Sequence, residues 1–301
     1  MLGKRNFLQN QESGQALVVI VLLLLGLLGV LALAVDGGNI YWQRRYAQNA
    51  ADAGAMAGAR VLAYNGTADE ARATAQEYAV QRNQADRCDV IMDGAYVTAV
   101  AYKDVAMTFG RVVGVQQVTV SARATAMWAP ISELGGLAPL SIREFDYQFG
   151  IPYTIWDDET DRDPNSGHIS GSYRGWLNLP CVYPQSCGAA GTDKLKSWMV
   201  SGWPGISRVD TWVAGDGGVK AAVIQQARVG NVLKIAVFDR IEAKYATQTY
   251  YHVVKFAAFR VTNVYATGNP KGIKGTFEYM LSAGPLGEGP DGGYRTISLT
   301  R

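Results

Sequence analysis

The chain has 301 residues, with 28 Lys or Arg against 26 Asp or Glu, so its formal net charge at pH 7 is +2. This balance and a charged fraction of only 18% argue against a disordered polyelectrolyte and a dedicated nucleic-acid binder. The 34 glycines follow no three-residue period, which excludes a collagen-like chain, and 3 cysteines are too few for a disulfide-built scaffold.

The first predicted element is a membrane-spanning helix from Ala16 to Val35. These residues carry no charge and no strongly polar side chain. At about 1.5 Å per residue, a helix of this length crosses the roughly 30 Å hydrocarbon core of a bilayer. The apolar run is longer than that of a cleaved secretory signal, and no A-x-A pattern follows Val35. A buried helix of a soluble protein is the alternative.

Basic residues flank both ends of this span and give no clear orientation. Lys4 and Arg5 precede it, and Arg44 and Arg45 follow it. Long domains cross the membrane largely regardless of their charge. We therefore expect the short amino-terminal tail in the cytoplasm and the bulk of the chain outside.

A second helical stretch, from Asn39 to Ala63, is rich in small residues. Asp36-Gly37-Gly38 predicts a weak point between it and the span. Small side chains let a helix approach its neighbour closely. The predicted packing residues are Ala50, Ala51, Asp52, Gly54 and Gly58. Two interpretations stay open: the helix lies on its own domain, or it meets another subunit.

A small α/β module is predicted next. Asn65-Gly66-Thr67 ends the long helix and caps another helix from Ala68 to about Asn83. Alternating strands follow at residues 96–102 and 118–126, with a short helix at 107–113 between them. The module ends near residue 130.

The remainder of the chain predicts a mainly antiparallel β domain. Short helices are expected at residues 192–200 and 219–228, and strands at 232–238, 251–264, 275–281 and 294–299. The fold class is therefore α+β. The predicted divisions are 1–14 for a leader-like tail, 15–63 for the transmembrane and stalk helix, 64–130 for the small module and 131–301 for the β-rich domain.

Motifs of enzymes are largely missing from the sequence. It holds no G-x-S-x-G, H-E-x-x-H or Walker A phosphate-loop pattern, and its two histidines, His168 and His252, leave little material for a catalytic triad. Residues 287–292 satisfy G-x-G-x-x-G, but the pattern leads into a strand, whereas dinucleotide binding needs a helix amino terminus there. We expect no enzyme, no small-molecule substrate and no nucleic-acid partner.

An acidic loop is the one feature that resembles a ligand site. Asp161, Asp163 and Asn165 alternate as oxygen donors, as at the start of a calcium loop. The sixth position is Ser166 in place of Gly, and the twelfth is Ser172 in place of Glu. A Ca²⁺ site and a solvated acidic loop are the two interpretations, and no other cofactor is expected.

Cys181 and Cys187 bracket a short loop that contains Pro184. A disulfide between them is compatible with an oxidising, extracytoplasmic space, and a pair of free thiols is the alternative. Cys88 is then left over.

Several short motifs, in order, resemble the TadE/TadG-like proteins of tight-adherence (Tad/Flp) pilus systems. They are Ser13–Val18, the apolar span, Ala34–Gly38, Arg44-Arg45 and Gln48–Ala59. Residues 109–115 and 118–126 resemble the end of the same module, so the resemblance covers about residues 13 to 129.

This resemblance implies a pilin-like structural or assembly subunit, held in the membrane, that contacts other pilin-like subunits or itself. It also implies a processing site between Gly14 and Gln15, although Val19 stands where pilins carry Glu. Two alternatives remain. The chain is a major subunit of an extracellular filament with its helix in the filament core, or an anchored glycan-binding or glycan-acting module.

Overall fold

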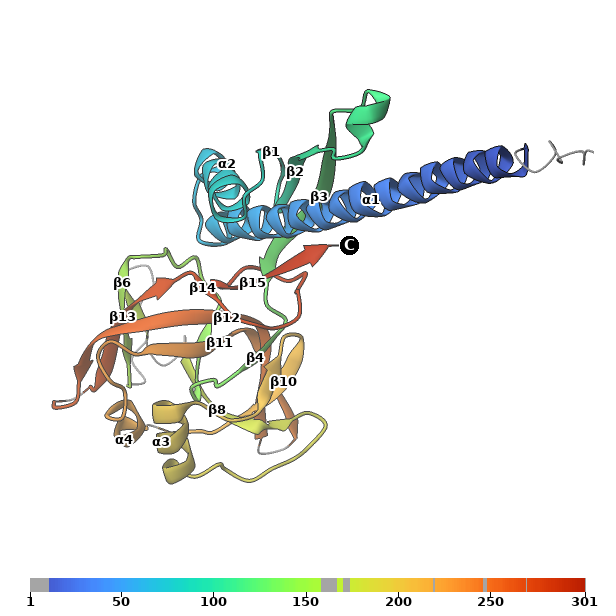
Figure 1. The fold of residues 1–301 in the computed structure, drawn as a ribbon. Coiled ribbons are helices and arrows are strands. Elements are labelled where there is room, and N and C mark those ends of the chain that lie inside the picture. The colour runs from blue at the N-terminus through green and yellow to red at the C-terminus, as the bar shows by residue number, and fades with distance from the viewer. Residues whose placement is uncertain are drawn as a thin grey trace, which may run out of the picture.

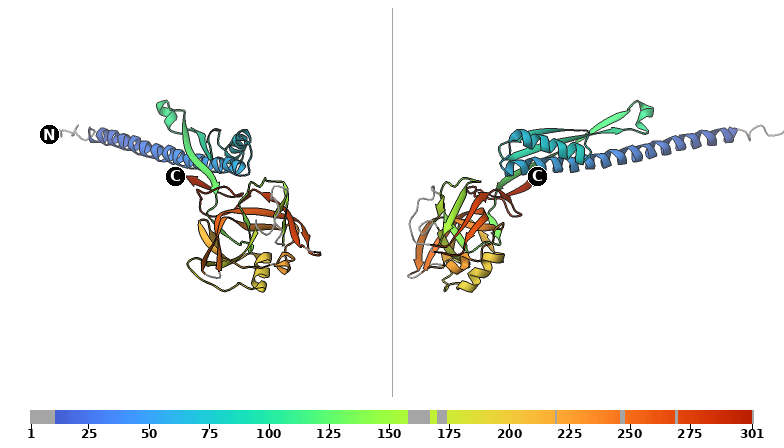
Figure 2. Two further views of the ribbon diagram at one scale, coloured as in Figure 1. Left: turned by 180° about the vertical axis from the view of Figure 1, so that it is seen from behind. Right: turned by 90° about the vertical axis from the view of Figure 1, so that its left-hand side faces the viewer.

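The computed structural model describes residues 11–157, 167–169, 174–218, 220–245, 248–268 and 270–300. A long helix projects from a folded body made of two parts (Figure 1). A small α/β module covers the carboxyl-terminal half of the helix, and a mainly antiparallel β domain lies beyond the end of the helix (Figure 2). The predicted α+β class is confirmed.

Helix α1 runs without interruption from Gln11 to Ala63, a length of 53 residues. The weak point predicted at Asp36-Gly37-Gly38 does not break it. Each glycine costs a helix only about 1 kcal/mol relative to alanine. The packing of Ile40 and the contacts of Asp36, described below, hold the helix in place on both sides of the glycines.

Two short helical segments pack beside α1. Helix α2 (Ala68–Gln76) begins at Thr67, whose hydroxyl accepts from the Glu70 N–H while the Glu70 carboxylate accepts from the Thr67 N–H. This capping box confirms the predicted helix start. The helix then continues as the π-helical turn η1 (Glu77–Arg82).

The sheet of the module has the strand order β1-β2-β3-β15-β14. Its strands are β1 (Arg87–Asp93), β2 (Tyr96–Ala106), β3 (Gln117–Pro130), β14 (Met280–Leu281) and β15 (Tyr294–Thr300), and the 3₁₀ turn η2 (Gly110–Val113) lies between β2 and β3. Strand β15 pairs antiparallel with β3, with Ile297 opposite Trp128. Strand β15 therefore belongs to the sheet of the first module, although it follows the domain boundary predicted at residue 130.

An alanine-rich core joins this sheet to the helices. Its buried residues come from α1, η1, β1, β2 and β3 and from the segment just before β1, and they are mostly alanines, among them Ala51, Ala55, Ala79, Ala99 and Ala126. Small side chains bring the helix backbone close to the sheet, so the core is thin and tightly packed.

The second part is built on an eight-stranded sheet of order β10-β8-β5-β11-β12-β13-β6-β7. The bounds are β5 (Leu140–Arg143), β6 (Pro152–Trp156), β7 (His168–Ile169), β8 (Arg174–Val182), β10 (Thr211–Gly215), β11 (Val232–Tyr245), β12 (Gln248–Tyr265) and β13 (Gly272–Glu278). An additional pairing of β10 with β12 closes five of these strands into a ring. Its core holds large apolar side chains such as Phe259 and Phe277.

Smaller elements complete this part. Strands β4 (Glu133–Gly135) and β9 (Ile206–Arg208) form a separate pair. Helix α3 (Thr192–Ser201) matches the prediction, whereas α4 (Ala221–Ile224) is shorter than the helix predicted over residues 219–228.

Candidate functional site: the amino-terminal helix

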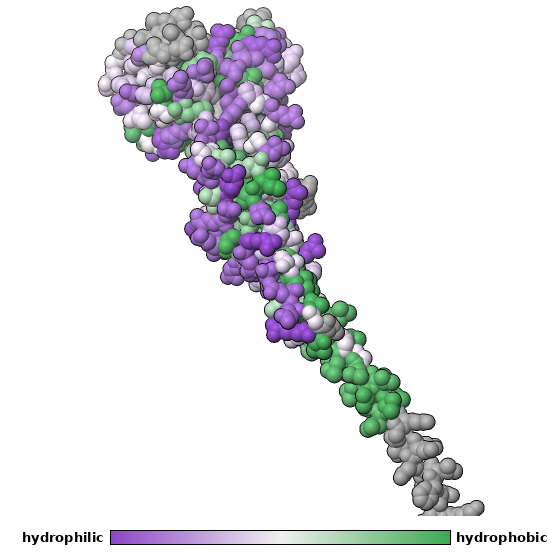
Figure 3. All heavy atoms as spheres, turned by 90° about the horizontal axis from the view of Figure 1, so that it is seen from above, coloured by the Kyte–Doolittle hydropathy of each residue, from purple (hydrophilic) through white to green (hydrophobic). Residues whose placement is uncertain are grey.

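The first half of α1 carries a continuous apolar surface. Between Leu17 and Val35 every large aliphatic side chain is exposed, with Leu33 at 76%. In the part of the chain that the structure describes, α1 is long enough and apolar enough to cross a membrane. None of the residues in its most apolar 18-residue stretch is buried against the rest of the protein. Figure 3 shows this hydrophobic rod projecting from a largely hydrophilic body. The residues Ala16 to Val35 thus lie where lipid can surround them.

Asp36, directly after this apolar run, attaches the helix to the β2–β3 hairpin. Its Oδ1 accepts from the Thr108 N–H at 2.8 Å, and its Oδ2 accepts from the N–H groups of Phe109 and Gly110 at 3.0 and 2.7 Å. Burial raises the pKa of this carboxyl, but the three backbone donors and the Thr108 side chain together lower it by more, so the pKa lies below its usual range. Asp36 is therefore a charged latch between helix and hairpin.

The small-residue stretch of α1 packs on the protein's own module. A Cβ added at Gly54 would lie 3.0 Å from the Ala75 carbonyl oxygen, and one at Gly58 would lie 2.8 Å from a methyl of Val97. Ala50 and Ala51 are fully buried in the same core. Asp52 is half-buried and accepts from the Gln48 amide at 2.8 Å. The structure therefore agrees with the first of the two interpretations, in which this part of the helix packs on its own domain.

Comparison with known proteins identifies this same segment. Residues 14–61 match the family described as putative Flp pilus-assembly TadE/G-like. Because of this similarity, residues 14–61 are called the TadE/G-like segment below. The TadE/G-like segment coincides with α1 and contains the apolar run, Asp36 and the small-residue stretch. No curated protein and no solved structure matches the chain.

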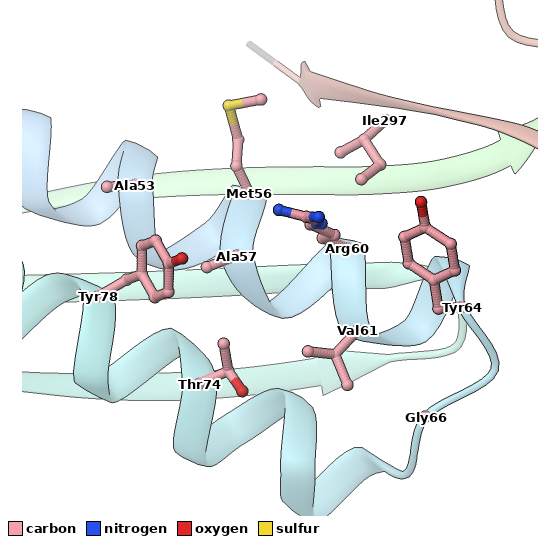
Figure 4. Close-up of a pocket in the computed structure, with 10 residues that line it drawn as sticks. All are labelled: Ala53, Met56, Ala57, Arg60, Val61, Tyr64, Gly66, Thr74, Tyr78 and Ile297. Carbon is pink, nitrogen blue, oxygen red and sulfur yellow. The ribbon is translucent and has the colours of Figure 1, made fainter. Parts of the chain in front are cut away.

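An apolar groove runs along the far end of the TadE/G-like helix. It has a volume of about 660 Å³ and lies between α1, α2 and β15 (Figure 4). Met56, Tyr64 and Ile297 contribute apolar surface from two of these elements, and Arg60 lies among them. The groove is open to solvent and is a candidate contact surface.

The remaining predicted site residues lie away from this helix surface or at its start. Gly14 and Gln15 lie in the first turns of α1. Asp161, Asp163 and Asn165 fall outside the described residues, so the calcium interpretation stays a prediction. Within the ranges that the structure covers, no three His, Cys, Asp or Glu side chains gather as metal ligands.

The cysteines and histidines take structural positions. Cys181 and Cys187 form a disulfide, and Cys88 is a buried free thiol. Nδ1 of His168 accepts from the Trp156 indole N–H at 2.9 Å. The ring nitrogens of His252 lie 2.8 Å from Asp239 and 2.9 Å from Asp210. These contacts tie loops and strands of the β domain together.

The Asp36 latch is the feature that sequence reasoning missed. The signal available was a carboxylate placed at the end of an apolar run, together with a glycine-containing turn at residues 107–115. Neither pattern indicates that two segments more than seventy positions apart come together, so this contact could be recognised only in the folded structure.

Proposed function

We propose that this protein is a membrane-anchored, pilin-like structural or assembly subunit of a Tad/Flp-type pilus or surface apparatus. The observation that carries this proposal is the exposed apolar half of α1 within the TadE/G-like segment. An exposed apolar surface of this size is costly in water and is stable in lipid. The anchor and the family match therefore support the same role.

The continuity of α1 supports an anchor that is rigidly connected to the folded part of the chain. The helix passes from the apolar run into the alanine-rich core without a break, so the folded body is rigidly joined to the span. In this proposal the short tail is cytoplasmic and the two folded parts lie outside the membrane. The Cys181–Cys187 disulfide suits such an oxidising space.

In this role the protein acts through protein–protein contacts, without catalysis and without a cofactor. Partners are other pilin-like subunits or further copies of the chain. Gly54 and Gly58 are already covered by α2 and β2, so contacts to a partner use other surfaces. The groove beside Met56 and Tyr64 is one such surface.

Fractionation of the native full-length protein tests the anchor. We expect it in the membrane fraction, resistant to carbonate and released by detergent. For orientation, Val229, a 62% exposed residue of the β domain, is replaced by Cys in a Cys88→Ser background. A membrane-impermeant maleimide should then label intact cells at this position.

Recovery of the protein in the soluble fraction as a monomer would overturn the proposal. Recovery chiefly in sheared extracellular fibres, with a terminus starting at Gln15, would support the filament alternative instead. Crosslinking in the membrane fraction, followed by mass spectrometry of the products, identifies whether the partners are pilin-like subunits.

A further inference from the structure

The tip of the β2–β3 hairpin, residues 107–116, exposes an apolar surface that the folded module does not use. Val112 is 85% exposed, and Phe109 and Val115 are exposed as well. Arg111 is the only charged residue in the sequence from Val105 to Ala122. The tip thus combines exposed aliphatic and aromatic groups with a single cation.

We propose that this tip is a second membrane contact, which enters the headgroup region of the bilayer beside the span. The inference rests on the proposed membrane anchor and adds a binding surface to it. Its partner is the lipid surface into which α1 inserts.

The position of the tip follows from the Asp36 latch. Asp36 comes directly after Val35, the last residue of the apolar run, and its carboxylate binds the backbone of residues 108–110. The tip is therefore held at the depth where the helix leaves the hydrocarbon core. Figure 2 shows the hairpin running along α1 and ending beside its middle.

The hairpin is held firmly at this depth. Val105, Met107 and Val120 form a small apolar cluster that packs against Ile40 of α1. Within the tip, the Met107 N–H donates to Gln116 at 3.0 Å, and the Val115 N–H donates to Gly110 at 2.9 Å. The exposed side chains thus project from a closed, hydrogen-bonded turn.

The chemistry of the tip fits the membrane interface. Aliphatic and aromatic side chains enter the boundary between headgroups and acyl chains, while an arginine reaches anionic phosphates. Tyr41 and Trp42, both exposed on α1, lie about 7.5 to 9 Å further along the helix axis than Asp36, at the level of an interfacial aromatic belt. Because the tip lies beside the span, lipid covers it as soon as α1 inserts.

Depth-dependent quenching in vesicles tests the proposal. The full chain, with Cys88→Ser, receives one environment-sensitive fluorophore at Val112→Cys and is reconstituted in phosphatidylcholine–phosphatidylglycerol vesicles. Two matched sites serve as controls: Leu24→Cys in the apolar run and Val229→Cys in the β domain, both exposed in the protein.

We expect the emission of the fluorophore at position 112 to shift to shorter wavelength in vesicles. Lipids labelled near the headgroup should quench this emission, and aqueous iodide should quench it less. Position 229 should respond to iodide alone, and position 24 to lipids labelled deep in the acyl chain. Val115→Cys is a second tip position, in case labelling at 112 disturbs the turn.

Positions 112 and 115 both behaving like position 229, while position 24 reports deep insertion, would overturn the hairpin contact and leave the anchor intact. Failure of lipid quenching at position 24 would overturn the anchor, and with it the basis of the hairpin contact.

Discussion

The Arg295 guanidinium donates a 2.7 Å hydrogen bond from Nη1 to the carbonyl of Ala63, the last residue of α1. The same side chain binds the Asp291 carboxylate, and its guanidinium carbon lies over the rings of Trp128 and Tyr279, 4.2 and 4.0 Å from their centres. One residue of the final strand therefore closes the end of the amino-terminal helix. A cation at this end also complements the helix dipole.

Replacing Arg295 with Met should destabilise the protein. The change removes the cation that pairs with Asp291 Oδ2 and the donor to the Ala63 carbonyl, while Asp291 Oδ1 keeps its hydrogen bond from the Gly293 N–H. We expect a loss of about 2–3 kcal/mol, slightly below the ~3–5 kcal/mol typical of a fully buried pair, because Asp291 keeps 27% of its side chain exposed. Chemical denaturation of the full chain in detergent measures this loss.

The matched control for Arg295→Met is Arg208→Met, which removes the exposed pair with Glu133. A surface ion pair contributes only about 0–1 kcal/mol. Equal losses in the two variants would contradict the role assigned to Arg295.

A leucine at Gly58 should disrupt the packing of α1 on its module. Its Cβ would lie 2.8 Å from Val97 and 3.2 Å from the Ala71 carbonyl oxygen, so helix and sheet must separate. Overpacking of this kind costs about 1–3 kcal/mol. Thermal unfolding followed by circular dichroism gives the change in midpoint.

Gly38→Leu is the control for this substitution, since a Cβ at Gly38 meets nothing within 4 Å. It should leave the midpoint unchanged or raise it, because leucine favours helix over glycine. A Gly58→Leu variant as stable as Gly38→Leu would show that the close approach at Gly58 is not needed.

The Asp36 latch should weaken in acid. The folded pKa of Asp36 lies below its ordinary value, so the carboxylate stabilises the fold at every pH above its unfolded pKa of about 3.9. This stabilisation is lost as the pH falls through the lowered folded pKa. Asp36→Asn presents an amide N–H₂ to backbone donors and lacks the charge, so it should be less stable than the native chain at pH 7.

The difference in stability between the native chain and Asp36→Asn should therefore shrink as the pH falls below about 4. Denaturant titrations of both proteins at a series of pH values measure it. A difference that stays constant from pH 7 to pH 2 would be inconsistent with a charged latch.

Thr67→Ala should remove the hydroxyl that accepts from the Glu70 N–H at the start of α2. Loss of such a cap costs about 1 kcal/mol. Glu70→Gln keeps an acceptor for the Thr67 N–H and should cost less. The unfolding midpoints of the two variants give the comparison, and a larger loss in Glu70→Gln would contradict the capping box.

The sequence predicts the elements whose causes are local. The apolar run from Ala16 to Val35 requires a helix wherever lipid surrounds it, and Thr67 with Glu70 marks a helix start within four residues. The alternation of β2, β3, β12 and β15 likewise predicts strands. Strand β1 (Arg87–Asp93) was not predicted, although its pairing with β2 is a simple antiparallel hairpin.

The tertiary structure decided which distant segments meet. No periodicity places β15 beside β3, Arg295 on the carbonyl of Ala63, or the Asp36 carboxylate on residues 108–110. Each contact depends on the path of the whole chain, because a hydrogen-bond donor satisfies an acceptor equally well from any position in the sequence. The sequence by itself therefore determined that a long apolar helix is followed by an α+β body, while the fold alone determined how that body is attached to the helix.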